Sequence, residues 1–206
     1  MKALLINGSP NEKGCTYTAL TEVERTLNKN GIETELLWLG NAPVANCVDC
    51  GFCRQQGRCV HDDAVNRVID ELDSISALVV GSPVYYAYAS GQLCSFMDRL
   101  FHSCGRRMAG KLGASVVSCR RGGASAAFDR LNKYFTISNM PIVSSQYWNQ
   151  VHGNTPEEVM QDEEGLQTMR TLAENMAWLI KCIEAGRRAG IELPEYEKRI
   201  GTNFIR

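Results

Sequence analysis

The first twenty residues constrain the fold of this chain more than any other stretch. A short apolar run at 3–6 is long enough for one buried strand, and a loop without strong helix or strand formers follows at 7–14. A helical pattern then begins at Cys15 and Thr16, which places a helix N-terminus directly after the loop. Loop amides, hydroxyl groups and the positive end of a helix dipole favour an anion at such a position. The stretch therefore predicts a phosphate-binding loop between a strand and a helix.

Apolar runs and helical patterns alternate along most of the remaining chain. They predict strands at 3–6, 33–39, 77–80, 114–117 and 141–147, and helices at 16–30, 91–107 and 124–139. Asp62 or Asp63 can cap a further helix, and a last helix begins at the capping box of Thr155 and Glu158. We therefore expect an α/β fold, a doubly wound five-stranded parallel sheet of order 2-1-3-4-5 with helices on both faces. Residues 1–190 fit one domain with a cysteine-rich loop at 40–62, and 191–206 form a C-terminal tail.

The composition argues against several classes of partner. A net charge of −1 gives no electrostatic case for nucleic acid or an anionic membrane. No apolar run approaches the ~20 residues that a membrane span needs. Nine cysteines without a recognisable export signal indicate thiols or metal ligation rather than a disulfide framework, so we expect a cytoplasmic location.

Two similar loops fall where this topology places its ligand. Gly8-Ser9-Pro10 follows the first strand and Gly81-Ser82-Pro83 follows the third, on either side of the switch point. Five residues separate Gly8 from Gly14 and no lysine follows, so the first loop is not a triphosphate-binding P-loop, and it also lacks the dinucleotide fingerprint. Its hydroxyl groups and helix N-terminus suit a single phosphate monoester.

The loops after the third and fourth predicted strands indicate the shape of the rest of the ligand. Residues 83–90 offer aromatic surface to a flat ring, and 118–123 offer close backbone approach and two arginines. A ligand with one phosphate and one flat heterocycle matches FMN. The plain alternative is that all three loops are ordinary turns with tyrosines packed against a helix.

The same motifs resemble those of the NADPH-dependent FMN reductase family, which has a flavodoxin-like fold. The resemblance covers roughly 1–183 and rests on the two Gly-Ser-Pro loops, on Gly14-Cys15-Thr16 and on Asp98-Arg99. Asn11 and Cys15 depart from the pattern, because many relatives have a basic residue and an asparagine there. The resemblance implies no catalytic side chain and an FMN site formed by Ser9, Pro10, Gly14, Cys15, Thr16, Tyr17, Thr18, Pro83, Val84, Tyr85, Tyr86, Ser118, Arg120, Arg121, Gly122 and Gly123.

A second motif lies in the cysteine-rich loop. Cys47, Cys50, Cys53 and Cys59 have the spacing C-x2-C-x2-C-x5-C, close to the compact triplet of bacterial ferredoxins. The pattern resembles the iron-sulfur flavoproteins, which implies a [4Fe-4S] cluster; zinc or free thiols are the alternatives. Because the loop follows the second strand, we expect it at the flavin edge of the sheet.

These features lead to two main hypotheses of function. The first is an FMN-dependent NAD(P)H oxidoreductase that passes hydride from nicotinamide to flavin and on to a small-molecule or protein acceptor, with Arg120 or Arg121 stabilising negative charge. The second is an electron carrier that uses FMN and a [4Fe-4S] cluster with a ferredoxin-like partner. A zinc-stabilised interaction module is a third. Related flavoproteins often complete the flavin site at a subunit contact, so we expect a homodimer or tetramer.

Overall fold

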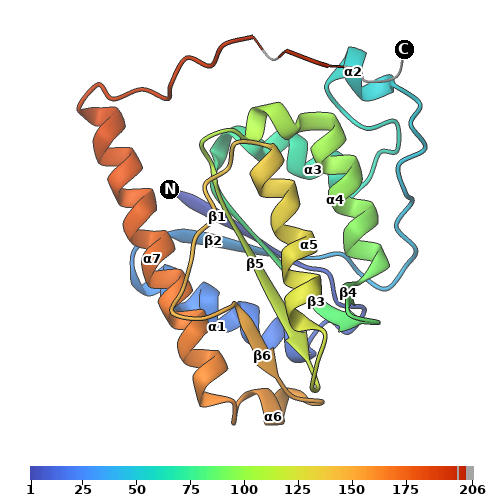
Figure 1. Cartoon of the computed structure of the whole chain (residues 1–206), viewed down its shortest axis with the longest axis vertical. Helices are drawn as coiled ribbons and strands as arrows, with labels where there is room; N and C mark the ends of the chain where they lie inside the picture. Colours follow the sequence, from blue (N-terminus) through green and yellow to red (C-terminus); the bar gives the residue numbers. More distant parts are fainter. Residues whose placement is uncertain (199, 203–206) are drawn as a thin grey trace.

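Five parallel strands form the centre of the computed structural model, which describes residues 1–198 and 200–202 (Figure 1). Neighbouring strands follow the order β2-β1-β3-β5-β6, and every pair along this path is parallel. This confirms the predicted order 2-1-3-4-5 for the parallel strands. The strands are β1 (Lys2–Asn7), β2 (Glu33–Trp38), β3 (Ile75–Tyr85), β5 (Leu112–Cys119) and β6 (Gln150–His152).

Helices cover both faces of the sheet, as predicted (Figure 1). The longer helices are α1 (Cys15–Lys29), α3 (Ala64–Glu71), α4 (Gly91–Cys104), α5 (Ala124–Ile137) and α7 (Glu163–Arg188), and the short ones are α2 (Phe52–Gln56) and α6 (Pro156–Val159). Alternate residues of β1 divide between the two layers: Leu4 and Ile6 pack under α3, α4 and α5, whereas Ala3 and Leu5 pack under α1 and α7.

Helix N-termini differ in how their first amides are satisfied. Asp63, rather than Asp62, caps α3, and Ser90 caps α4 through the Leu93 amide. In contrast, α1 follows Gly14 with neither a side-chain cap nor an acidic residue in its first turn. The first amides of α1 therefore face the sheet edge without a side-chain acceptor.

The third strand is longer than its apolar run predicted. Pairing with β5 continues to Pro83 opposite Ser118, and the chain then folds back as β4 (Tyr88–Ala89), antiparallel to the end of β3. The segment expected to be a loop at 81–90 is therefore the end of β3 followed by a hairpin at 84–89. The apolar pattern ends at Val80 although Gly81 and Ser82 are also buried. A Cβ added at Gly81 would fall 2.7 Å from Leu20, and the Ser82 hydroxyl hydrogen-bonds within this segment, so neither position carries an apolar side chain.

Two predictions near the C-terminus are wrong. The expected fifth strand at 141–147 makes only an isolated bridge, Gly113 with Ile142, and the strand itself is β6. The Ser145 hydroxyl donates to the Tyr147 carbonyl at 2.5 Å, and this local turn competes with sheet pairing. The last helix is likewise divided: Thr155 caps only the short α6, and Asp162 caps α7 separately.

Helix α7 ends at Arg188, and the described residues beyond 190 contain no helix or strand. Leu193 packs over Gly110, where an added Cβ would fall 2.5 Å from the Leu193 Cδ2 atom. Of the helices in the described part of the chain, none has the length and apolar character of a membrane span.

Candidate functional site

Three loops meet at the carboxyl ends of β1, β3 and β5. The Gly8 amide donates to the Gly81 carbonyl at 2.9 Å, which joins the loops after β1 and β3. The hydroxyl groups of Thr16, at the start of α1, and Ser118, near the end of β5, lie 2.9 Å apart and are both buried. The sheet topology thus brings the predicted loops to one edge, as the switch-point argument requires.

Hydrogen bonds hold the loop after β1 in one shape. The Ser9 amide donates to Asn7 Oδ1 at 3.0 Å, and the Ser9 hydroxyl accepts from the Asn11 amide at 3.1 Å. Trp38 Nε1 donates to the Ser9 carbonyl at 2.8 Å from the end of β2. Sequence reasoning missed Asn7 and Trp38; a polar residue ending a buried strand was the available signal. Pro10 lies half-buried between Ser9 and Asn11.

Two of the predicted loop residues have local partners. The Cys15 thiol contacts the Gly153 carbonyl at 3.7 Å, and the Thr18 hydroxyl donates to the Gly14 carbonyl at 3.3 Å. Burial, with Glu157 and Glu158 nearby, raises the pKa of Cys15. Its position at a helix N-terminus therefore does not produce an acidic thiol. Tyr17 is half-buried in the same turn.

A tight hairpin supplies the aromatic wall. Tyr85 pairs with Tyr88, and the two residues between them, Tyr86 and Ala87, have φ values of 52° and 59°. Two central residues with positive φ are the signature of a type I′ turn, which usually uses Asn and Gly. Tyr86 is fully exposed and Tyr85 is half-exposed, while Pro83 and Val84 are half-buried below them. The strained turn thus presents aromatic rings at the sheet edge.

The loop after β5 packs directly against this hairpin. Gly123 has φ 85°, and a Cβ added there would fall 2.8 Å from the Ala87 Cα atom. The neighbouring Gly122 has open space around its Cβ position, and Arg120 and Arg121 are exposed. Gly123 therefore allows a close backbone approach that a side chain would prevent.

A polar network that sequence reasoning missed braces the hairpin from behind. Arg130 donates to the hydroxyl groups of Tyr88, at 2.6 Å, and Tyr134, at 2.9 Å, and its guanidinium lies 4.5 Å from the Tyr134 ring centroid. The Tyr134 hydroxyl in turn donates to Asp98. Burial and Asp98 raise the pKa of Tyr134, so this hydroxyl stays protonated. The network links β4 to α4 and α5.

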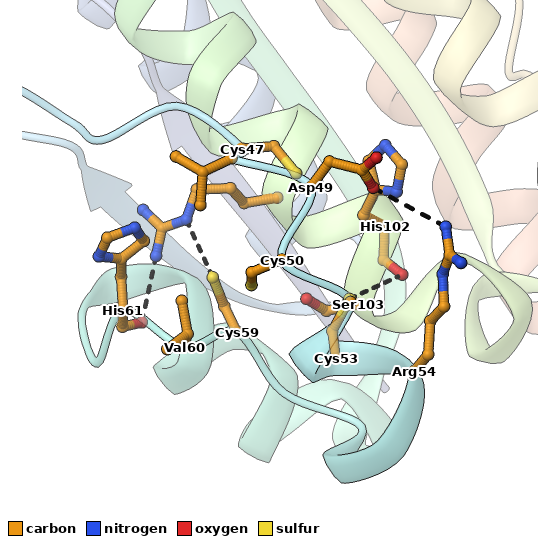
Figure 2. Close-up of a pocket in the computed structure, with 13 residues that line it drawn as sticks. Cys47, Asp49, Cys50, Cys53, Arg54, Cys59, Val60, His61, His102 and Ser103 are labelled. Carbon is orange, nitrogen blue, oxygen red and sulfur yellow. Dashed lines mark hydrogen bonds and ion pairs between the residues drawn. The ribbon is translucent and has the colours of Figure 1, made fainter.

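The four motif cysteines line a separate pocket with a cavity of about 30 Å³ (Figure 2). All four are free thiols, and Gly51 and Gly57 bound the short helix α2 with positive φ. The Cys53 thiol contacts the His102 carbonyl at 3.7 Å, and Arg99 Nε donates to Cys59 Sγ at 3.1 Å. Within residues 1–198 and 200–202, no three His, Cys, Asp or Glu side chains have the arrangement of a metal site.

The position of this pocket corrects one expectation. Segment 40–62 begins at the flavin edge, where Gln92 Nε2 donates to the Gly40 carbonyl at 2.6 Å. The pocket, however, includes His102 and Ser103 at the other end of α4 (Figure 1). The pocket begins at Arg99 and extends to Ser103, roughly 12–18 Å along α4 from Gly91, so the cysteines lie away from the three loops within one chain.

Comparisons with known proteins agree with this architecture. An iron-sulfur flavoprotein of Methanocaldococcus jannaschii is 29% identical over 192 residues, covering 89% of this chain and 100% of the relative. An iron-sulfur flavoprotein of Methanosarcina thermophila is 27% identical over 192 residues, covering 91% of this chain and 99% of the relative. A solved flavodoxin from the domain Archaea superposes with a TM-score of 0.60 at 18% identity, covering 88% of this chain and 99% of that one, which supports the fold.

The family model described as NADPH-dependent FMN reductase matches residues 1–155, three quarters of the chain. This match spans β1 through β6, and so includes all three loops and the cysteine motif. The chain therefore belongs to the NADPH-dependent FMN reductase family and is a flavin-dependent oxidoreductase with a flavodoxin-like fold.

Proposed function

We propose that the protein is an FMN-dependent NAD(P)H oxidoreductase that passes hydride from nicotinamide to flavin and on to a small-molecule or protein acceptor. The observation that carries the proposal is the uncapped N-terminus of α1, which lies beside a buried hydroxyl pair and below an exposed aromatic hairpin. A phosphate at this position would satisfy the first amides of α1 and interact favourably with its dipole. The family match supports the same assignment.

The phosphate end of the site is formed by the loop after β1. The backbone of Gly14, Cys15, Thr16 and Tyr17 would supply amide donors, and the Ser9 and Thr16 hydroxyls add neutral donors. Pro10 and Thr18 act on loop shape, because the Thr18 hydroxyl already donates to Gly14. No acidic residue lies in the first turn of α1 to repel the anion.

The ring end is formed by the hairpin and the loop after β5. Pro83, Val84, Tyr85 and Tyr86 would face one side of the isoalloxazine, and Ser118, Gly122 and Gly123 would let backbone approach its edge. Arg120 and Arg121 are exposed there, and we assign them to negative charge on the ring or on the nicotinamide cofactor. Replacing both with Ala should raise the KM for pyridine nucleotide; unchanged kinetics would remove that assignment.

Thr16→Val tests the phosphate assignment, because it removes a hydroxyl while keeping the side chain's shape. Losing a hydrogen bond to a charged group costs roughly 1.5–3 kcal/mol, or about 10- to 100-fold in affinity. We expect the variant to lose affinity for FMN but not for riboflavin, measured by quenching of flavin fluorescence. Thr21→Val is the control, since its hydroxyl donates to the Tyr17 carbonyl one turn further along α1. Equal loss for both flavins would refute the phosphate position.

The cysteine pocket favours a second candidate function, an electron carrier that uses FMN and a [4Fe-4S] cluster with a ferredoxin-like partner. The four thiols that line one pocket have the number and kind of donors that such a cluster uses, although among the described residues no three of them are arranged to hold a metal ion; a cluster there would supply one-electron transfer. His61 Nε2, which also lines the pocket, is buried without a hydrogen-bond partner among the described residues. The two relatives are named iron-sulfur flavoproteins. Anaerobic purification should give about four irons per chain. A yellow, iron-free and fully active protein would exclude this function. Zinc bound by the four cysteines would exclude the cluster.

The distance between the two sites bears on assembly. Because roughly 12–18 Å of α4 separates the loop edge from the cysteine pocket in one chain, a neighbouring copy would give a shorter path for electron transfer between a cluster and a flavin. We therefore propose a homodimer or tetramer in a reducing, cytoplasmic setting. Light scattering of the purified protein measures the assembly, and a strict monomer would contradict it.

A further inference from the structure

Arg99 is the most completely bonded charged side chain beside the cysteine pocket. It lies on α4, and its side chain is only 1% exposed. Its Nε donates to Cys59 Sγ at 3.1 Å, and its two terminal nitrogens donate to both Asp63 carboxylate oxygens at 2.7 and 2.9 Å. The same two nitrogens donate to the carbonyls of Ala45 and His61, at 3.3 and 3.1 Å. These five bonds use all five donors of the guanidinium.

This bonding fixes the direction of the Nε–H group. Asp63 and the two carbonyls accept from both terminal nitrogens of the guanidinium, so the remaining donor, Nε–H, points at the sulfur of Cys59. Burial of Asp63 opposes its charge, but Arg99 and the Val65 amide outweigh it and keep the pKa of Asp63 below its usual value. The ion pair is therefore present at neutral pH. Arg99 is held by four acceptors that do not depend on the sulfur.

A donor fixed in this way has a definite effect on a metal-bound sulfur. Hydrogen bonds and positive charge at cysteine ligands stabilise the more negative, reduced state of an iron-sulfur cluster and raise its potential. The other three motif cysteines receive no side-chain hydrogen bond of this kind within the described residues. Cys59 is thus distinguished from its three neighbours.

We propose that Arg99 is a positioning residue for the cluster: its Nε–H···Sγ bond holds Cys59 as a hydrogen-bonded ligand and raises the reduction potential. The inference rests on the cluster proposed above and deepens it. It also assigns Asp63 the role of orienting Arg99, in addition to capping α3.

The test begins with the wild-type protein, reconstituted anaerobically with iron and sulfide and labelled with 15N-arginine. Pulsed electron paramagnetic resonance of the reduced protein should show coupling to an arginine nitrogen. Iron and sulfide are quantified first: a chain that binds neither refutes the cluster itself and the inference with it. A loaded cluster without arginine coupling refutes the inference alone.

Potentiometric titration of variants supplies an independent measurement. Arg99→Met should shift the equilibrium toward the oxidised state at least tenfold, which is 59 mV for a one-electron couple. Arg99→Lys keeps the positive charge but loses the planar guanidinium, so its reduction potential should lie between those of Arg99→Met and the wild type. Arg58→Gln is the matched control, because Arg58 is a half-exposed arginine of the same loop that pairs with Asp62 at 3.2 Å rather than with a sulfur. Wild-type potentials in both iron-loaded Arg99 variants would overturn the proposal; if these variants lose iron, the nitrogen coupling decides it.

Discussion

Gly123→Ala is the sharpest test of how the three loops are joined. At φ 85° an L-residue pays about 1–2 kcal/mol, and the new Cβ would fall 2.8 Å from the Ala87 Cα, a backbone atom that cannot rotate away. Alanine recovers about 0.4–1 kcal/mol by restricting the unfolded chain. These two terms leave roughly 0–1.6 kcal/mol, and the contact with the Ala87 backbone adds to this loss. We therefore expect a net loss of about 1–2 kcal/mol, or a Tm lower by about 2–8 °C for a chain of this length.

The same substitution should also separate the loop after β5 from the aromatic hairpin. Scanning calorimetry of the flavin-free protein measures the loss of stability, and FMN titration measures the effect of separating the two loops. Gly122→Ala is the matched control for stability: its Cβ would meet open space and its φ is not positive, so its Tm should stay at the wild-type value. If the two variants behave alike, contact between these loops does not organise the site.

Two further predictions concern stability. Asp162→Ala removes the cap bonded to the Gly165 amide at 2.9 Å and leaves the His152 amide without its 2.6 Å acceptor, so urea unfolding should show a loss of about 1–3 kcal/mol. Burial raises the pKa of Cys104 from 9.0 to about 12, so the unfolded chain loses its thiol proton first and the free energy of unfolding should fall between pH 9 and 12. The full effect is roughly 4 kcal/mol, and a pH series that is equally steep in Cys104→Ala would contradict it.

Much of the fold was predictable because its signals are local. Uninterrupted apolar runs located the covered parts of the parallel strands, and alternation with helices led to the confirmed strand order. The prediction of the fifth strand was wrong because the apolar residues Ile142 and Val143 are followed by a turn that Ser145 stabilises. The pattern cannot report such side-chain competition with sheet pairing.

The sequence predicted which loops form the candidate site, but not the turn and the long-range contacts that hold them in place. Gly-Ser-Pro motifs mark two loops, yet the type I′ turn at Tyr86 and Ala87 carries none of the usual turn residues. The cysteine spacing identified a group of thiols, but its place depended on the path of segment 40–62 along α4. Arg99 contacts residues 36 to 54 positions away, a relation that no local pattern contains.

The buried hydroxyl pair of Thr16 and Ser118 has one more consequence. Two hydroxyl groups carry two hydrogens, and the 2.9 Å bond between their oxygens uses one of them. The direction of that bond decides whether the remaining hydrogen is offered from α1 or from β5. An anion at the start of α1 would draw the free hydrogen of Thr16 and leave Ser118 as the donor within the pair. The arrival of a ligand at one end of the sheet edge can thus reverse a proton arrangement shared with the neighbouring loop, without movement of any heavy atom.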